Sequence, residues 1–349
     1  MPNRQLGRSP LAIAPLVLGT NVFGWSVEAK RACQLLDAFV DGGGNLIDTA
    51  DVYPAWVPGN HGGESETIIG QWLQQSGKRG RVLLASKVGK WDRHAGLRPV
   101  NIRAALEDTL RRLRTDHLDL YFAHEDDASV PIADILGEFA RLIEAGKVRA
   151  IGASNFRAGR LATALEVARE HHLPRYECLQ PEYSLVARAG YEAELEPLAR
   201  REGLGVLGYY ALASGFLSGK YRCAADLAKS AARGRAAKRY LTPRGLAVLV
   251  ALDDVAAARH ATPAQVALAW LMARPGFTAP IASATSVAQL EELLGALRLT
   301  LSGEEIAALD RASAAPQRAT APVVLPAGLG AVLEAGAGSA SRSLGVSTV

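Results

Sequence analysis

The stretch 118–153, LDLYFAHEDDASVPIADILGEFARLIEAGKVRAIGA, contains two short apolar runs separated by a segment with a helical period. The runs at 118–123 and 148–153 have the length and apolar content of buried strands. Between them, apolar residues recur at three- and four-residue steps from Ile132 to Ile143, which is the pattern of an amphipathic helix. A strand, a helix and a second strand in this order predict a parallel βαβ unit.

The same unit repeats from about residue 16 to 300, where apolar runs alternate with turn signals and helical segments. Eight strands are predicted, at 16–19, 45–48, 82–87, 118–123, 148–153, 176–180, 205–208 and 279–282. Capping-box patterns at Thr262, Ser286 and Ser302 predict the starts of later helices. Eight such units predict an α/β fold, a single-domain (β/α)8 TIM barrel with an N-terminal hairpin and C-terminal additions.

A doubly wound dinucleotide-binding sheet is the rival architecture, but its GxGxxG fingerprint occurs nowhere in the chain. The run Gly42-Gly43-Gly44 precedes a strand, so it indicates the end of a helix. The predicted barrel covers residues 1–311. Residues 312–349 are rich in Ala, Gly, Ser, Pro and Val, and we expect this low-complexity tail to be poorly ordered.

Composition narrows the class of protein. With 349 residues, 49% apolar and 21% charged, the chain falls in the range of soluble globular proteins. Cys33, Cys178 and Cys223 form no CxxC pair, which argues against a disulfide framework or a structural zinc site and predicts a reducing, cytoplasmic location. The apolar run at 11–18 is far shorter than the roughly 20 residues of a membrane span, and it is too short for a secretory signal.

Charge is informative through its distribution. The net charge of +4 predicts no nucleic-acid partner. Residues 227–252 contain no acidic side chain but six basic ones, among them Arg233 and Arg239. This stretch is either a solvated surface or a flap that meets phosphate.

Four titratable side chains follow predicted strands. Asp48 ends the second strand with Tyr53 just after it, Lys87 ends the third, and His124 follows the fourth. Active sites of such barrels lie at the carboxyl ends of the strands, so these residues converge. Each alone is more often a cap, a packing residue or an ion-pair partner, but together they describe a proton-transfer site. A buried ammonium favours the phenolate of Tyr53, a carboxylate holds that ammonium, and a histidine steers a carbonyl.

The segment Asn45-Leu46-Ile47-Asp48-Thr49-Ala50-Asp51-Val52-Tyr53, with Gly63-Glu64-Ser65-Glu66, Lys87 and His124 after it, resembles the aldo-keto reductase superfamily. The resemblance spans roughly residues 1–311, and Asp48, Tyr53, Lys87 and His124 match the catalytic tetrad of that family. Gly152-Ala153-Ser154-Asn155 and Leu217-Ser218-Gly219-Lys220-Tyr221 are similar to the branch of bacterial aldo/keto reductases and potassium-channel beta subunits.

The resemblance implies a nicotinamide cofactor, NADP(H), with NAD(H) or dual use open. Relatives commonly place Lys or Arg near residues 283–289 to hold the 2′-phosphate of NADP, whereas this segment offers neutral groups, and Leu293 stands where an Asn is usual. By the resemblance Ser154, Asn155 and Gln180 hold the carboxamide, Tyr209 stacks on the ring, and Arg233 lies on a flap. The implied cofactor-binding residues are Thr20, Asn21, Asp48, Ser154, Asn155, Gln180, Tyr209, Tyr210, Ala211, Leu212, Ser214, Gly215, Leu217, Ser218, Lys220, Arg233, Ser283, Thr285, Gln289 and Glu292.

The expected function is reversible reduction of an aldehyde or ketone to an alcohol, with Tyr53 as proton donor. Phe23, Trp25, Trp56 and Trp91 are predicted to line an apolar substrate pocket, although each ring is about as typical of loop packing. Two other functions stay open. One is a nicotinamide-binding redox sensor with little turnover, and the other is a metal hydrolase using His124-Glu125-Asp126-Asp127, which the scattered histidines disfavour. We expect a small-molecule substrate, no metal, no nucleic acid and no membrane, and leave the oligomeric state open.

Overall fold

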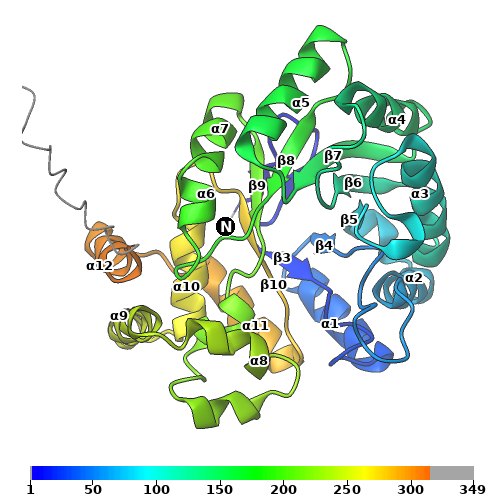
Figure 1. The fold of residues 1–349 in the computed structure, drawn as a ribbon. Helices are drawn as coiled ribbons and strands as arrows, with labels where there is room; N and C mark the ends of the chain where they lie inside the picture. The colour runs from blue at the N-terminus through cyan, green and yellow to red at the C-terminus, as the bar shows by residue number, and fades with distance from the viewer. Residues whose placement is uncertain (1, 315–349) are drawn as a thin grey trace, which may run out of the picture. The chain divides into compact units, whose positions relative to one another are not determined.

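The computed structural model describes residues 2–314, in which eight parallel strands close into a barrel (Figure 1). The barrel order is β10-β3-β4-β5-β6-β7-β8-β9. The strands are β3 (Val17–Gly19), β4 (Leu46–Asp48), β5 (Leu83–Val88), β6 (Leu118–Ala123), β7 (Val148–Ser154), β8 (Tyr176–Gln180), β9 (Gly205–Gly208) and β10 (Ala279–Ala282). All eight predicted strands are confirmed to within one residue at each end, and the fold is the predicted (β/α)8 barrel.

Helices connect the strands and surround the barrel (Figure 1). The α-helices are α1 (Ala29–Asp41), α2 (Glu64–Ser76), α3 (Pro99–Leu113), α4 (Ile132–Glu144), α5 (Ala158–Glu170), α6 (Ala189–Glu192), α7 (Leu195–Glu202), α8 (Gly234–Ala237), α9 (Pro243–Arg259), α10 (Pro263–Met272), α11 (Val287–Gly295) and α12 (Gly303–Ser313). Short 3-10 turns are η1 (Lys78–Arg81), η2 (Asp92–His94), η3 (Ala213–Ser218), η4 (Ala224–Lys229), η5 (Lys238–Tyr240) and η6 (Ala296–Arg298).

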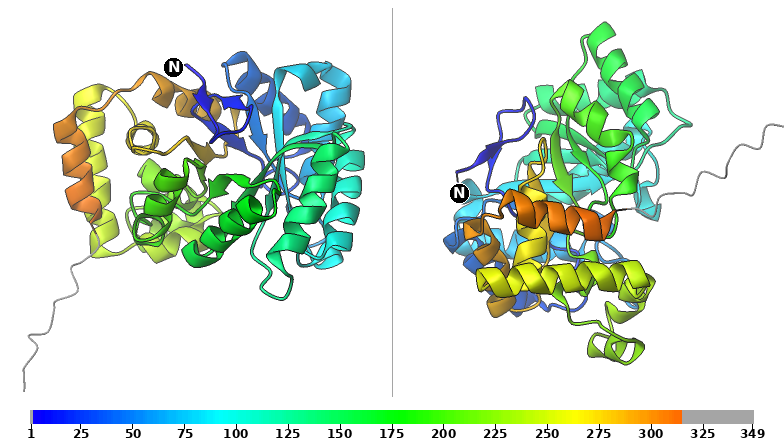
Figure 2. Two further views of the ribbon diagram at one scale, coloured as in Figure 1. Left: turned by 90° about the horizontal axis from the view of Figure 1, so that it is seen from above. Right: turned by 90° about the vertical axis from the view of Figure 1, so that its left-hand side faces the viewer.

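The core has two layers because each strand buries both faces. One cluster fills the space between strands and helices, and a smaller one fills the barrel interior. The predicted hairpin pairs β1 (Arg4–Gln5) with β2 (Ala12–Ile13) and is drawn in dark blue next to the N label (Figure 2). It adds Leu6, Leu11 and Ile13 to the inner cluster. This hairpin covers the amino-terminal ends of the strands, so the carboxyl ends remain for the site.

Two of the three predicted capping boxes are confirmed. Thr262 and Ser302 each exchange reciprocal hydrogen bonds with the residue three positions later. At α11 only half of the box forms. Ser286 accepts the Gln289 N–H, but the Gln289 side chain accepts from the N–H and hydroxyl of Thr285, one residue before the cap.

Near the predicted end of the barrel at residue 311, α12 ends at Ser313. The remainder of the predicted tail, 315–349, lies outside the described residues.

Candidate active site

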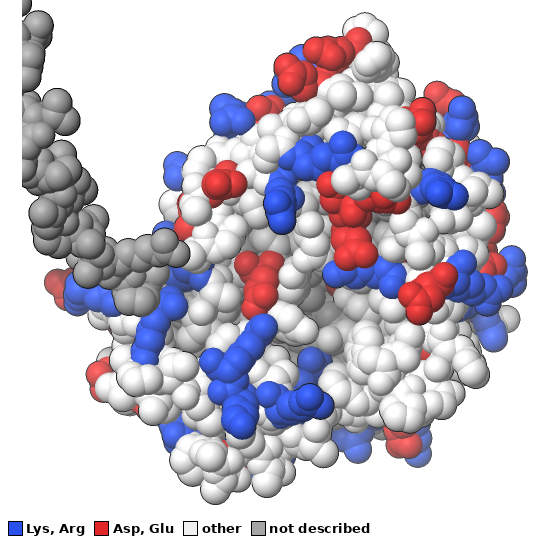
Figure 3. Space-filling model, in the orientation of Figure 1, with Lys and Arg blue, Asp and Glu red and all other residues white. Residues whose placement is uncertain are grey.

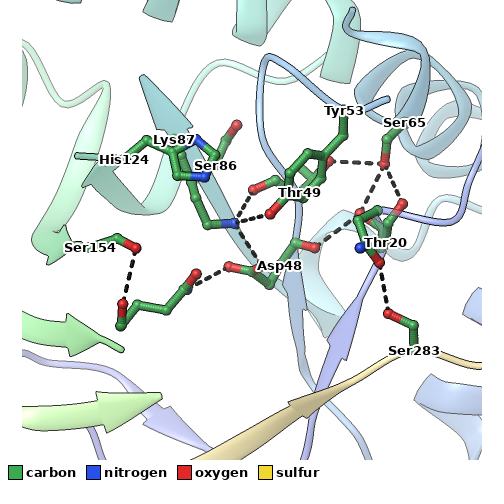
Figure 4. Close-up of polar contacts among 12 residues, drawn as sticks. Thr20, Asp48, Thr49, Tyr53, Ser65, Ser86, Lys87, His124, Ser154 and Ser283 are labelled. Carbon is green, nitrogen blue, oxygen red and sulfur yellow. Dashed lines mark hydrogen bonds and ion pairs between the residues drawn. The ribbon is translucent and has the colours of Figure 1, made fainter. Parts of the chain in front are cut away.

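The four predicted catalytic residues meet at the carboxyl ends of β4, β5 and β6 (Figure 4). Asp48 is the last residue of β4, Tyr53 lies in the turn that follows, Lys87 is on β5 and His124 follows β6. In-register pairing of the parallel strands brings these positions to one edge, because Asp48 is paired with Ala85 and Lys87 with Phe122.

Lys87 is the centre of the arrangement and has no exposed surface. Its Nζ donates to Asp48 Oδ2 at 2.7 Å and to the Thr49 carbonyl at 2.6 Å, and it lies 3.4 Å from the Tyr53 hydroxyl. An ammonium has three donors, and these three contacts use them all. The lysine therefore couples the carboxylate of Asp48 to the phenol of Tyr53.

Electrostatics keep both groups protonated. Burial raises the pKa of Tyr53 above its usual value, and the Lys87 ammonium opposes this shift. For Lys87, burial acts to lower the pKa, but the Asp48 carboxylate and Tyr53 together raise it. The expected pull of Lys87 toward a phenolate thus has the predicted sign, but burial outweighs it. The resting pair is a neutral phenol beside a charged ammonium.

His124 faces the same space. Its side chain is almost completely buried, and its Nδ1 has no hydrogen-bond partner among residues 2–314. Its ring lies edge-on to the Tyr53 ring with centroids 6.0 Å apart. Burial, with Lys87 and Lys90 nearby, holds the pKa of His124 well below its usual value. At neutral pH the imidazole is therefore neutral and has hydrogen-bonding capacity to offer a ligand.

The residues predicted to hold a carboxamide are joined to this centre. Gln180 Nε2 donates to Asp48 Oδ1 at 2.9 Å, and Ser154 Oγ donates to the Gln180 carbonyl at 3.0 Å. Thr20 Oγ1 donates to the Asp48 carbonyl at 2.9 Å from the opposite side. Both oxygens of Asp48 are therefore fixed, and the strand-end polar groups form one network.

Asn155 connects this network to the predicted stacking ring. Its backbone is left-handed (φ 57°), and its Nδ2 donates to the His124 carbonyl at 2.8 Å. The Tyr209 hydroxyl donates to Asn155 Oδ1 at 2.8 Å, and burial raises the pKa of Tyr209 to about 12. An ordered neutral phenol therefore lies beside the amide groups.

The loop after β9 has an unusual backbone. Tyr210, Ala213 and Ser214 have positive φ without being glycine, and Gly215 follows at 84°. Such strain costs about 1–3 kcal/mol per residue and gathers at ligand sites. Lys220 closes against Gly215, where a Cβ would lie 3.1 Å from Nζ. Of the other predicted clamp residues, Ala211 and Leu217 are buried, and Leu212 is partly buried against the core. Ser218 Oγ donates to the Gly215 carbonyl.

Arg233 crosses from the flap, residues 224–242, to the barrel. Its Nη2 donates to Asn21 Oδ1 at 3.3 Å, its guanidinium lies 4.8 Å from the Trp25 ring, and it has no ion pair within residues 2–314. Asn21 Oδ1 also accepts from Ser283 Oγ at 3.0 Å. Burial lowers the pKa of Arg233. Figure 3 shows Lys and Arg side chains gathered around α8 on this face.

A second flap contact was not predicted. Arg239 Nη2 lies 2.8 Å from Glu182 Oε1, and its guanidinium lies 5.7 Å from the Tyr210 ring. Arg239 stands in the acid-free stretch, which was the available signal, but its partner 57 residues earlier could not be inferred from spacing.

The residues predicted for the adenine end are neutral or already engaged. Thr285 and Gln289 are bonded to each other. Glu292 Oε1 accepts from Thr262 Oγ1 at 2.7 Å, so it faces the start of α10. Leu293 is buried in the outer core.

Of the four predicted pocket aromatics, Trp56 contacts the Tyr53 ring, and Trp25 contacts Trp56 in turn. Trp56 is 47% exposed and packs edge-on against Tyr53 (5.7 Å) and Trp25 (5.8 Å). Phe23 is fully buried in the outer core, and Trp91 packs between Arg93 and Arg112, which are 5.6 and 5.2 Å from its ring. These two rings fit the loop-packing interpretation.

The acidic side chains after β6 form ion pairs and a hydrogen bond with neighbouring segments. Glu125 lies 3.5 Å from Lys90 and Asp126 lies 3.0 Å from Arg160, while Asp127 accepts from the Leu97 N–H. Within residues 2–314 no group of three His, Cys, Asp or Glu is placed to hold a metal ion. In the same part of the chain, every helix is too short or too polar to cross a membrane.

The family model described as Aldo/keto reductase family matches residues 15–314. The chain belongs to this family. It is similar to the protein named Uncharacterized oxidoreductase YrpG of Bacillus subtilis (strain 168), at 37% identity over 87% of this chain and 93% of the relative. Protein tas of Escherichia coli (strain K12) is 34% identical over 89% and 97% of the two chains. Norsolorinic acid reductase stcV of Emericella nidulans is 31% identical over 85% of this chain and 78% of its own. The protein is thus an aldo/keto reductase family oxidoreductase.

Proposed function

We propose that this protein is an NAD(P)H-dependent carbonyl reductase in which Tyr53 is the proton donor. The observation that carries the proposal is the buried contact series from Asp48 through Lys87 to the Tyr53 hydroxyl, at 2.7 and 3.4 Å. It places one titratable O–H, held by a fixed positive charge, at the mouth of the barrel. The family membership and the oxidoreductase relatives support the same reaction class.

The residues around the mouth fit a nicotinamide dinucleotide. Arg233 and Lys220 are cations without an ion pair in residues 2–314, and Lys220 lies against Gly215 at the end of the left-handed run from Ala213 to Gly215. The Ala213 and Gly215 N–H groups donate to the Tyr210 and Leu212 carbonyls, so the Ser214 N–H and the Lys220 ammonium are the donors that this run would offer a diphosphate. Ser154, Asn155 and Gln180 would hold the carboxamide, and Tyr209 would lie against the ring.

When bound, the reduced cofactor supplies a hydride to the carbonyl carbon. The chain's own residues handle the proton. The Tyr53 O–H protonates the carbonyl oxygen as negative charge develops there, and the Lys87 ammonium stabilises the phenolate that results. Asp48 keeps Lys87 charged and in place, while the neutral His124 donates a hydrogen bond to the same oxygen and orients it.

NADP(H) is our choice of cofactor because the flap carries Arg233, Arg235, Lys238 and Arg239. The neutral groups at Ser283, Thr285 and Gln289 predict a modest preference, with NAD(H) used as well. The three cysteines are free, which supports the cytoplasmic location proposed for the activity.

The substrate would enter beside Trp56, whose ring forms an apolar wall next to Tyr53 and packs edge-on against Trp25. Aldehydes and ketones carried on apolar or ring-shaped bodies fit this wall. The direct test is a panel of carbonyls and alcohols assayed with NADPH and with NADH, scored by kcat/KM. Turnover of several carbonyls supports the proposal. Tight NADPH binding without turnover of any carbonyl would instead favour the redox-sensor function.

A further inference from the structure

Behind the candidate active site, an ion pair joins helices α2 and α3. Glu66 on α2 has no exposed surface, and Arg112 Nε on α3 lies 2.6 Å from its Oε2. Neither residue belongs to the site described above. The pair is nevertheless in contact with both segments that carry the proton-transfer residues.

The first of these contacts is to β5. Ser86 Oγ donates to Glu66 Oε1 at 2.5 Å, and Ser86 directly precedes Lys87. Successive side chains of a strand point to opposite faces. Ser86 therefore faces the helices while Lys87 faces the barrel mouth, and Glu66 fixes the strand from its outer side.

The second contact is to the loop that carries Tyr53. This loop ends at Gly63, whose φ of +83° is left-handed and where a Cβ would lie 2.5 Å from Arg112 Cδ. The Arg112 guanidinium lies 5.2 Å from the Trp91 ring, and a Cβ on Gly62 would lie 2.8 Å from that ring. The end of the loop is therefore packed closely against two side chains, with Gly62 on Trp91 and Gly63 on Arg112. Just beyond it, the Ser65 N–H donates to the Tyr53 carbonyl at 3.2 Å.

Asp51 adds a third element. It is fully buried two residues before Tyr53, neither carboxyl oxygen has a partner in residues 2–314, and its N–H donates to the Lys87 carbonyl at 3.4 Å. Burial raises the pKa of Asp51 well above its usual value, the Glu66 carboxylate raises it further, and the Arg112 guanidinium opposes the shift. Through its N–H, Asp51 joins the Tyr53 loop to the strand that carries Lys87.

We propose that Arg112 and Glu66 are positioning residues that hold the Tyr53 hydroxyl in register with the Lys87 ammonium. Glu66 fixes the strand of Lys87 through Ser86, and Arg112 fixes the loop of Tyr53 through Gly63 and Trp91. The inference rests on the proposed function, because it assigns a purpose to the 3.4 Å contact between Tyr53 and Lys87.

The chain supplies a matched control on the same helix. Glu138 on α4 is also fully buried, and Arg103 on α3 binds it through two contacts of 2.8 Å. The hydrogen bonds of this pair stay within α3 and α4. The experiment compares the double variants Arg112→Gln/Glu66→Gln and Arg103→Gln/Glu138→Gln, each of which removes both charges of a pair.

Two readouts are taken. Hydrogen exchange of the backbone amides in residues 50–64 is measured in the cofactor-free chain and needs no activity. We expect faster exchange there in the Arg112/Glu66 variant only. In turnover, we expect this variant to lose about 10- to 100-fold in kcat, the effect of a misplaced reacting group, with the NADPH Kd unchanged and a larger primary deuterium isotope effect. The control variant should show none of these changes, whatever its loss of Tm.

Each outcome decides the inference. Unchanged exchange in residues 50–64, or equal losses of kcat in the two double variants, would overturn it and leave Arg112 and Glu66 as structural residues only. If the exchange result appears but the wild-type chain reduces no carbonyl, the proposed function fails while the control of the Tyr53 loop by this pair stands.

Discussion

Lys87 Nζ lies 2.7 Å from Asp48 Oδ2, and both side chains are almost completely excluded from water. A buried ion pair of this kind contributes little net stability as a pair, but breaking it leaves one charge buried and unpaired. The pair therefore links the proposed chemistry to the stability of the barrel mouth.

Replacing Lys87 by Met is expected to lower both the turnover and the stability of the protein. It removes the charge that stabilises the Tyr53 phenolate, so kcat falls by at least ~100-fold. It also leaves Asp48 unpaired, which costs about 3–5 kcal/mol of unfolding free energy in urea titrations. The double variant Lys87→Met/Asp48→Asn should recover most of that stability and none of the activity. Recovery of activity in the double variant would contradict the role given to Lys87.

The pH dependence follows from Tyr53 and His124. Burial raises the pKa of Tyr53 above 10, so the proton donor stays protonated throughout the neutral range. kcat/KM for reduction should be flat from pH 6 to 9 and fall above about 10, while kcat/KM for alcohol oxidation should rise with pH over the same range. The pKa of His124 is held well below 6.5, so no inflection is expected near that pH. An inflection near pH 6.5 that disappears in His124→Gln would show that the imidazole titrates in the working range.

Asp51 predicts a stabilising substitution. Burial, followed by the charge of Glu66, raises its pKa well above the ordinary 3.8. Above pH 3.8 the folded chain therefore holds a proton that the unfolded chain has released, and stability is lost as pH rises toward the folded-state pKa. Asp51→Asn carries no such cost, so its Tm should exceed that of the wild type by a margin that grows with pH through this window and then stays constant. Each 1 kcal/mol gained corresponds to about 2 °C. The exposed Asp254→Asn is the control, and an equal Tm gain there, or none at Asp51, would argue against the assignment.

Of the two flap arginines Arg233 and Arg235, we expect only Arg233 to contribute to cofactor affinity. Arg233 lies across Asn21 and Trp25 without an ion pair, whereas Arg235 on the same flap is exposed. Arg233→Gln should raise the Kd of both NADPH and NADH about 10-fold, the loss of one charge-assisted contact, as measured by quenching of tryptophan fluorescence. Arg235→Gln should change neither Kd by more than about twofold. A loss confined to NADPH would assign Arg233 to the 2′-phosphate instead.

The fold followed from local patterns. The eight strands were predicted to within one residue because each is a short, mostly buried run between amphipathic helices, and neighbouring residues alone show that pattern. The convergence of Asp48, Lys87 and His124 followed as well, because parallel strands bring their carboxyl ends to one edge.

Contacts between distant segments could not be predicted from the sequence. Glu66 and Arg112 are 46 residues apart, and Arg239 and Glu182 are 57 apart, so no spacing rule could pair them. Phe23 and Trp91 could not be sorted from Trp56, since ring type does not say which way a loop side chain turns. The effect of Lys87 on the pKa of Tyr53 has the predicted direction, but the larger and opposite effect of burial is a property of the folded chain and could not be inferred from the sequence. Asp51 had a signal, a second acid three residues after Asp48.

The central claim is that the Tyr53 hydroxyl gives the proton, and Tyr53→Phe tests it most directly. The substitution removes one oxygen and leaves Lys87 bound to Asp48. Turnover of the best carbonyl should fall by about 10²- to 10⁴-fold, the usual contribution of a positioned acid, while the NADPH Kd measured on the same preparation stays within about twofold. A Tyr53→Phe variant that binds NADPH normally and keeps a near-wild-type kcat would contradict the account.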